Sequence, residues 1–162
     1  MTRSDLERLY DYGYWANDRL FQVVATLTTE QFTQPVAGAY GSIRNTLVHT
    51  LSAEWGWLDR CGGPSRGPKL VPDDYPTFAV LKERWKQVEG HMRAFLAKLT
   101  DQDLARSVEF KFGELPAQSR TVADLLLHGV VHGAHHRGQT ALLLRSLGFP
   151  PGDFDFVYYS GP

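Results

Sequence analysis

Residues 127–139 of the chain read LHGVVHGAHHRGQ, and they hold four of its six histidines. They lie inside a longer segment, 121–147, whose apolar residues recur at helical spacing, so one long helix is predicted here. Histidine binds divalent metals as a neutral imidazole at physiological pH. Because a helix repeats about every 3.6 residues, His132 and His136 share one face and can bind the same ion. His128 and His135 lie toward the edge of that face.

Three further segments show apolar residues at three- and four-residue steps and are predicted to be helices. The segment 4–27 begins with Ser4-Asp5-Leu6-Glu7, which fits a capping box. Ser42 is the expected N-cap of a helix over 42–60, and Thr77 opens a helix over 77–99. Between these two, residues 61–76 are rich in glycine and proline and are predicted to form a long loop.

A short alternating pattern precedes the last helix. Val108, Phe110 and Phe112 alternate with charged residues, and Gly113-Glu114 can form a turn, so a small hairpin is predicted within 107–120. Four helices of this length predict an all-α four-helix bundle with a small β-hairpin before the fourth helix. The length fits one domain over residues 1–162, and the aromatic tail 154–159 is expected to dock on the bundle.

Composition excludes several classes of partner. A formal net charge of −1 gives no basic stripe of the kind that nucleic acids require. No apolar run is long enough to span a bilayer, and no signal-like leader opens the chain, so no membrane partner is expected. Cys61 is the single cysteine, which fits a reducing cytoplasm. We expect it to be a small residue at a helix end rather than a reactive thiol.

A third metal ligand has to come from another segment, and only His49 and His91 remain. His91 follows Glu89-Gly90 and is expected to face solvent or a partner. His49 lies among apolar residues, where an imidazole is either a hydrogen-bonded core residue or a ligand, and the pair on the last helix favours the ligand. A rim of hydrogen-bonded histidines without metal stays open as the alternative, because two histidines four residues apart form a motif of only moderate specificity.

Gly129 and Gly133 lie four residues apart beside the histidines. A glycine inside a helix costs about 1 kcal/mol relative to alanine, so a packing or functional reason is expected. The two glycines either let a neighbouring helix approach closely or leave room for a ligand above the metal.

Several motifs resemble those of one known family. They read YGYWAN at 12–17, GSIRNTLVH at 41–49, AEW at 53–55, HGAHHRGQ at 132–139 and LGFPP at 147–151. The chain resembles the DinB/YfiT-like superfamily of metal-dependent proteins. This resemblance implies an up-down-down-up bundle, often homodimeric, with one divalent ion, nickel or zinc, bound by His49, His132 and His136. It also implies transfer or isomerisation reactions that use low-molecular-weight thiols.

Three neutral imidazoles leave a divalent ion with an open position, as in catalytic zinc sites. A small thiol there is deprotonated and becomes a nucleophile, which favours a metal-dependent S-transferase acting on a small-molecule substrate. One alternative is a hydrolase that uses metal-bound hydroxide. Another is a non-catalytic, metal-binding dimeric protein, whose metal would gain a fourth protein ligand from His128 or from the partner chain.

Residues around the site are expected to orient the imidazoles. The candidates are Asn17, Asn45 and Glu54, although the helical position of Glu54 favours a structural role. Arg137 either meets an anionic substrate or forms an ordinary ion pair between helices. Imidazole ligands do not select among nickel, zinc, copper and iron.

Overall fold

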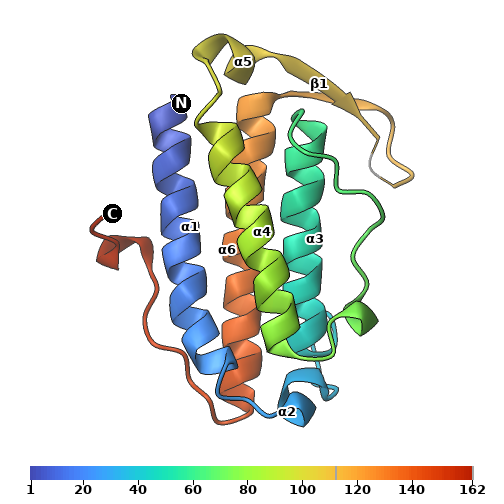
Figure 1. Cartoon of the computed structure of the whole chain (residues 1–162), viewed down its shortest axis with the longest axis vertical. Helices are drawn as coiled ribbons and strands as arrows, with labels where there is room; N and C mark the ends of the chain where they lie inside the picture. Colours follow the sequence, from blue (N-terminus) through green and yellow to red (C-terminus); the bar gives the residue numbers. More distant parts are fainter. Residues whose placement is uncertain (112, 162) are drawn as a thin grey trace.

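The computed structural model describes residues 1–111 and 113–161. Within these residues four long helices form a bundle: α1 (Arg3–Val24), α3 (Ile43–Arg60), α4 (Phe78–Leu96) and α6 (Val122–Ser146). Helices α1 and α6 run in one direction, and α3 and α4 run in the opposite direction (Figure 1). The predicted up-down-down-up four-helix bundle is therefore confirmed.

Short elements connect the long helices. They are α2 (Thr29–Thr33), the 3-10 turn η1 (Pro72–Asp74), α5 (Asp101–Ala105), the strands β1 (Ser107–Phe110) and β2 (Gln118–Thr121), and the turn η2 (Phe156–Tyr158). The strands pair antiparallel from Ser107 opposite Thr121 to Phe110 opposite Gln118, which confirms the hairpin. Phe112, which was assigned to the alternating pattern, lies outside the described residues.

Capping side chains define where the helices begin. Ser42, Thr77 and Thr121 are the N-caps of α3, α4 and α6, as predicted. The predicted capping box at Ser4 is wrong. Thr2 caps α1 instead, because its hydroxyl accepts a hydrogen bond from Asp5 N at 3.2 Å and the Asp5 carboxylate accepts one from Thr2 N at 2.8 Å.

Two helix ends also differ from the prediction. Helix α1 ends at Val24 rather than at 27, because Thr28 caps the next short helix, α2. Helix α4 ends at Leu96 rather than at 99, and Thr100 then caps α5. In both cases a threonine with its own capping box begins a short helix a few residues after the long helix ends.

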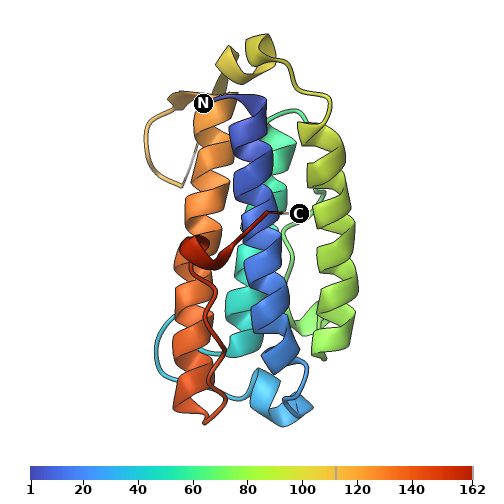
Figure 2. The same cartoon turned by 90° about the vertical axis from the view of Figure 1, so that its left-hand side faces the viewer.

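The bundle places α6 against both α1 and α3, so residues on different faces of α6 meet different helices (Figure 2). The aromatic tail lies along α1, as its composition predicts. Tyr12 donates a hydrogen bond to Phe154 O at 3.2 Å, and its ring meets the Phe156 ring edge to face at 4.9 Å. None of the helices in the described part of the chain combines the length and the apolar character that crossing a bilayer requires.

Candidate metal centre

Three histidines from two helices converge on one point. Helix α3 brings His49, and α6 brings His132 and His136. The Nε2 atom of His132 lies 3.3 Å from Nε2 of His49 and 3.0 Å from Nε2 of His136. One ligand atom from each of the three histidines lies within 4.8 Å of the others. A tetrahedral ion with bonds of about 2.0–2.1 Å to nitrogen places its ligands about 3.4 Å apart, so the cluster fits one such ion.

Gln139 orients the histidine that is most buried. The side-chain oxygen of Gln139 lies 2.7 Å from Nδ1 of His136. An amide oxygen only accepts hydrogen bonds, so Nδ1 of His136 carries the proton and Nε2 presents its lone pair to the cluster. Such a partner raises the basicity of an imidazole ligand and fixes its ring. Gln139 was not predicted as a site residue from the sequence, although its i,i+3 spacing from His136 is the signal for it.

Tyr40 covers the other side of the cluster. Its ring stacks on the His49 ring with a centroid separation of 3.9 Å and an interplanar angle of 19°. The Tyr40 hydroxyl lies 2.9 Å from Nε2 of His49. The structure therefore adds to the three histidines a hydroxyl that the sequence analysis missed.

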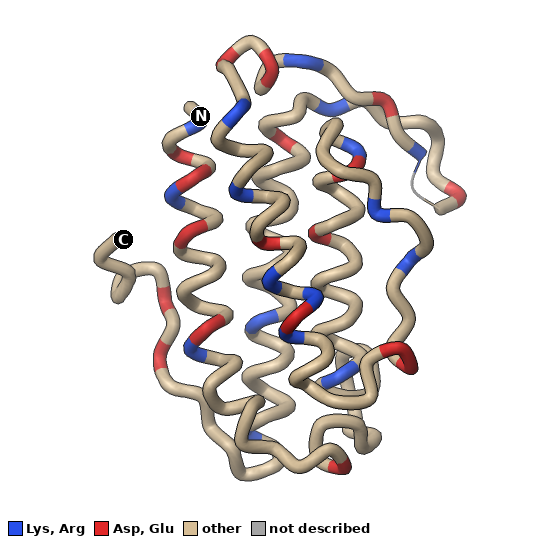
Figure 3. Tube along the Cα trace, in the orientation of Figure 1, with Lys and Arg blue, Asp and Glu red and all other residues tan. Residues whose placement is uncertain are grey.

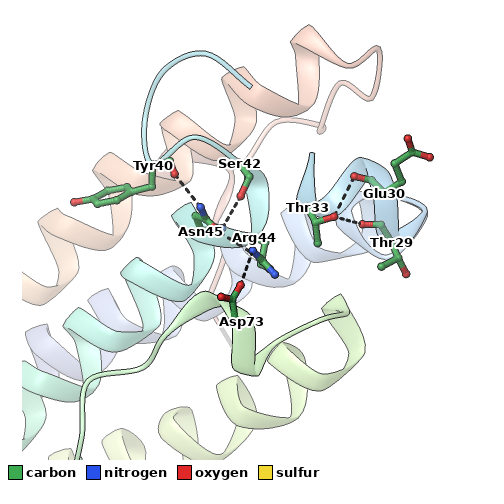
Figure 4. Close-up of polar contacts among 8 residues, drawn as sticks. All are labelled: Thr29, Glu30, Thr33, Tyr40, Ser42, Arg44, Asn45 and Asp73. Atoms are coloured by element: carbon green, nitrogen blue, oxygen red, sulfur yellow. Dashed lines mark hydrogen bonds and ion pairs between the residues drawn. The ribbon is translucent and has the colours of Figure 1, made fainter. Parts of the chain in front are cut away.

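The turn before α3 holds Tyr40 in this position. Gly38 (φ 96°), Ala39 (φ 45°) and Gly41 (φ 82°) lie in the left-handed region, which is unusual for the alanine. Asn45 donates a hydrogen bond from Nδ2 to Tyr40 O at 3.2 Å, as Figure 4 shows. Asn45 thus supports Tyr40 and not an imidazole, which corrects its expected role.

Burial keeps the clustered imidazoles neutral. It lowers the pKa of His49 and of His132 from 6.5 to about 4, and the neighbouring His136 adds to both shifts. Burial also lowers the pKa of His136, although the hydrogen bond that Nδ1 of His136 donates to Gln139 partly opposes this shift. At neutral pH the three nitrogens therefore carry the lone pairs that a metal ion requires.

A cavity of about 350 Å³ opens beside His49 and His132. His128 lines its rim, where the imidazole meets the Trp57 ring edge to face at 4.8 Å. The His128 ring centroid lies 5.8 Å from that of His132, and His128 is not a member of the three-histidine cluster. His128 therefore lines the cavity instead of closing the cluster as a fourth ligand.

The remaining candidates, Asn17, Glu54 and Arg137, lie where α1 meets its neighbouring helices and not at the cluster. The Tyr14 hydroxyl donates a hydrogen bond to Glu54 at 2.8 Å, and burial raises the pKa of Glu54 to about 7 against the effects of this bond and of Arg137. Arg137 is buried, donates a hydrogen bond to Asn17 at 3.3 Å and lies over the Tyr12 ring. Glu54 is thus a structural partner, and Arg137 contacts α1 through an amide and an aromatic ring rather than through the expected ion pair. Asn17 and Glu54 were expected to orient an imidazole, and neither of them does so.

The two glycines of α6 make room for neighbouring side chains. A Cβ atom at Gly129 would lie 2.7 Å from the Tyr10 hydroxyl, which donates a hydrogen bond to Leu126 O at 3.1 Å. A Cβ atom at Gly133 would lie 3.3 Å from Nη1 of Arg137. Close approach of α1 explains Gly129, whereas Gly133 leaves room for the Arg137 side chain of its own helix.

Three other residues lie outside the cluster. His91 is exposed, and His135 is exposed with its Nε2 3.0 Å from Nε2 of Gln139. Cys61 is buried at the end of α3, and burial raises the pKa of its thiol to about 11. A thiol so resistant to ionisation is a poor nucleophile, as expected from its sequence context.

The fold and the site together define a class of helical bundle with a candidate divalent-metal site between α3 and α6. The chain belongs to the DinB family, whose sequence model matches residues 1–161. The resemblance found in the sequence is thereby confirmed.

Two relatives come from Bacillus subtilis strain 168. The chain is 27% identical to Protein DinB in an alignment that covers 94% of this chain and 91% of that protein. It is 25% identical to the uncharacterized protein YizA over 152 residues, which cover 93% and 92% of the two chains.

Solved structures support the fold. A DinB-like protein from Bacillus cereus ATCC 10987 superposes with a TM-score of 0.68 at 22% identity, covering 86% of this chain and 91% of that one. A conserved protein from Enterococcus faecalis superposes with a TM-score of 0.64 at 13% identity, covering 90% and 96%. At these identities the likeness concerns the fold alone.

Proposed function

We propose that this protein is a metal-dependent enzyme that activates a small thiol for transfer to an electrophile. His49, His132 and His136 bind one divalent ion, nickel or zinc. The observation that carries the proposal is the convergence of three histidine nitrogens beside a cavity. His128 lines that cavity and does not supply a fourth ligand to the cluster. Three-ligand sites with an open position are typical of catalytic metal centres.

The bound ion would supply charge that lowers the pKa of a thiol placed at its open position. The thiol loses its proton to solvent, and the sulfur then donates an electron pair to an electrophilic carbon of the acceptor. A carbon–sulfur bond forms while the bond from that carbon to its leaving group breaks, and the leaving group departs with the bonding pair. The chain contributes the neutral imidazoles and a place for the substrate.

Tyr40 is the second group that supports this chemistry. Its hydroxyl lies at the Nε2 atom of His49, where it can donate a hydrogen bond to a substrate atom next to the cluster. The adjacent cavity of about 350 Å³ is near the lower end of the range for small-ligand pockets, about 300–1,000 Å³. These dimensions favour a low-molecular-weight thiol over a macromolecular substrate.

The direct test is turnover with a panel of small thiols and an electrophilic aromatic chloride, measured on nickel-loaded and zinc-loaded protein. We expect thiol-dependent chloride release that is lost in His49→Ala and retained in His135→Ala, a histidine next to the cluster but outside it. No turnover above the His49→Ala background across the panel would reject the proposal. Activity on ester substrates without thiol, rising near pH 7, would indicate hydrolysis instead.

We also propose that two copies of the chain form a homodimer through α6. Leu127, Val131 and Leu142 are 36%, 60% and 67% exposed, and the exposed residues Ala134 and Gly138 lie between them on the same stripe. Helical spacing directs this stripe away from the histidine cluster. Small residues between larger apolar ones allow a second helix to pack closely.

Sedimentation tests the dimer. Leu142→Glu is expected to convert a dimer to a monomer, because it places a charge within the packed stripe. Val157→Glu, in the tail and 81% exposed, is the control and should leave the dimer intact. A monomeric wild-type protein at micromolar concentration would reject this part of the proposal.

A further inference from the structure

The cavity beside the histidines is lined by positive charge. Arg60, Arg66 and Lys69 contribute to its wall, together with His49 and His132. The two arginines and the lysine come from the end of α3 and from the segment after it, where Figure 3 shows a series of basic positions. Among the lining residues that the structure describes there is no carboxylate to neutralise them. A cavity with this balance of charge attracts anions.

Hydrogen bonds hold the Arg66 side chain in the wall of the cavity. Its Nη1 atom donates to Ser52 O at 3.2 Å, and its backbone N donates to the Asp59 carboxylate at 3.2 Å. The Asp59 carboxylate therefore fixes the backbone at Arg66 through this amide. A guanidinium held in place loses less entropy when it binds a carboxylate.

Arg60 is held in a similar way by α3. Its guanidinium lies 4.9 Å from the centre of the Trp57 ring, and its Nη1 atom donates to Gly56 O at 3.1 Å. Both Trp57 and Gly56 belong to the same wall of the cavity. The two arginines are thus oriented before any ligand arrives.

Two buried polar atoms of this wall have no hydrogen-bond partner within the described chain. They are Oγ of Ser52, a residue only 2% exposed, and Nε of Arg66. Buried donors without partners are uncommon, because each costs about 1–3 kcal/mol. Both residues line the cavity, so its wall holds two donors that lack an acceptor.

We propose that this cavity binds the carboxylate of an anionic small thiol, with Arg60, Arg66, Lys69 and Ser52 holding the carboxylate and the sulfur reaching the His49 and His132 end. The inference rests on the proposed function and names the substrate class of that site. It makes the basic residues after α3 determinants of specificity. The histidines then select the thiol, and the basic wall selects the thiols that carry a negative charge.

A matched pair of thiols tests the proposal. The probes are 3-mercaptopropionate, which is anionic, and 3-mercapto-1-propanol, which is neutral and of similar length. Each is titrated into cobalt-loaded protein, and binding is read from the sulfur-to-cobalt charge-transfer absorption. We expect the anionic thiol to bind about tenfold more tightly, a difference of about 1.4 kcal/mol.

Variants separate the basic wall from the metal. Lys69→Gln and Arg66→Gln should each reduce the preference for 3-mercaptopropionate several-fold and leave 3-mercapto-1-propanol unchanged. Lys98→Gln removes an exposed positive charge elsewhere and is the control. Because Lys69 is exposed, its variant keeps the test valid even if Arg66→Gln is unstable. Equal affinities of wild type for the two thiols, or a preference that survives in both variants, would overturn the proposal.

A second readout does not depend on the metal. In metal-free protein, 3-mercaptopropionate should raise the melting temperature more than 3-mercapto-1-propanol at equal ionic strength, and Lys69→Gln should remove the difference. If cobalt fails to bind while this difference is seen, the proposed function fails and the anion site stands. If cobalt and both thiols bind but neither readout distinguishes the thiols, the anion site fails and the proposed function stands.

Discussion

At the scale of single residues, Gln139 is the support of the cluster that mutation can test most cleanly. Gln139→Leu removes the acceptor 2.7 Å from Nδ1 of His136. The ring then loses its fixed orientation, and we expect the dissociation constant for zinc to rise about 10–100-fold. Competition with a chromophoric chelator measures this constant.

Gln139→Glu is the matched control. A carboxylate at this position still accepts the hydrogen bond from Nδ1 of His136, so zinc affinity should equal or exceed that of the wild type. If the leucine variant binds zinc as tightly as the wild type, Gln139 does not orient His136.

The neutral histidines also make a prediction about pH. In the metal-free fold the pKa of His132 is about 4, against 6.5 for an unperturbed histidine. As the pH falls from 6.5 to 4, His132 becomes protonated in the unfolded chain but stays neutral in the folded chain. The free energy of unfolding therefore decreases through this window and levels off below it. His49 behaves in the same way.

Denaturant unfolding with a chelator present measures this effect. Glutamine at position 132 does not titrate. The free energy of unfolding of His132→Gln, relative to that of the wild type, should therefore increase as the pH falls from 6.5 to 4. Glu54, whose pKa is raised to about 7, contributes with the opposite sign and cancels in the comparison. A stability difference that stays constant between pH 7 and 4 would show that His132 is not held neutral by the fold.

At the scale of elements, α6 carries the site on one face and packs closely on α1 with another. Gly129→Ala places a methyl group 2.7 Å from the Tyr10 hydroxyl and should lower the free energy of unfolding by about 1–3 kcal/mol. Gly90→Ala on α4 meets no atom within 4 Å and should raise it by about 0.5–1 kcal/mol. Urea unfolding decides the signs, and a stabilised Gly129→Ala would contradict the close contact.

Local chemistry allowed most helix starts to be predicted from the sequence. Ser42, Thr77 and Thr121 each precede a clear apolar pattern, and all three are caps. The start of α1 was missed because Thr2 and Ser4 both have an acid three residues later, and the sequence alone does not rank them. The structure favours Thr2, which lengthens the helix.

At the scale of the whole molecule, the candidate site depends on packing that periodicity does not describe. The spacing of His132 and His136 follows from helix geometry, but His49 lies 83 residues before His132 and reaches it only through the contact of α3 with α6. Tyr40 was missed because its position depends on left-handed turn residues. Lys69 was missed for a related reason, since the path of a long loop over the bundle is set by tertiary contacts.

The central claim is that three of the six histidines bind one metal ion, and metal content after loading tests it most directly. Wild-type protein is incubated with zinc or nickel, freed of excess metal by gel filtration and measured by elemental analysis. We predict about one ion per chain for the wild type and for His135→Ala, and none for His136→Ala. An ion retained in His136→Ala, or lost equally in His135→Ala, would contradict the account.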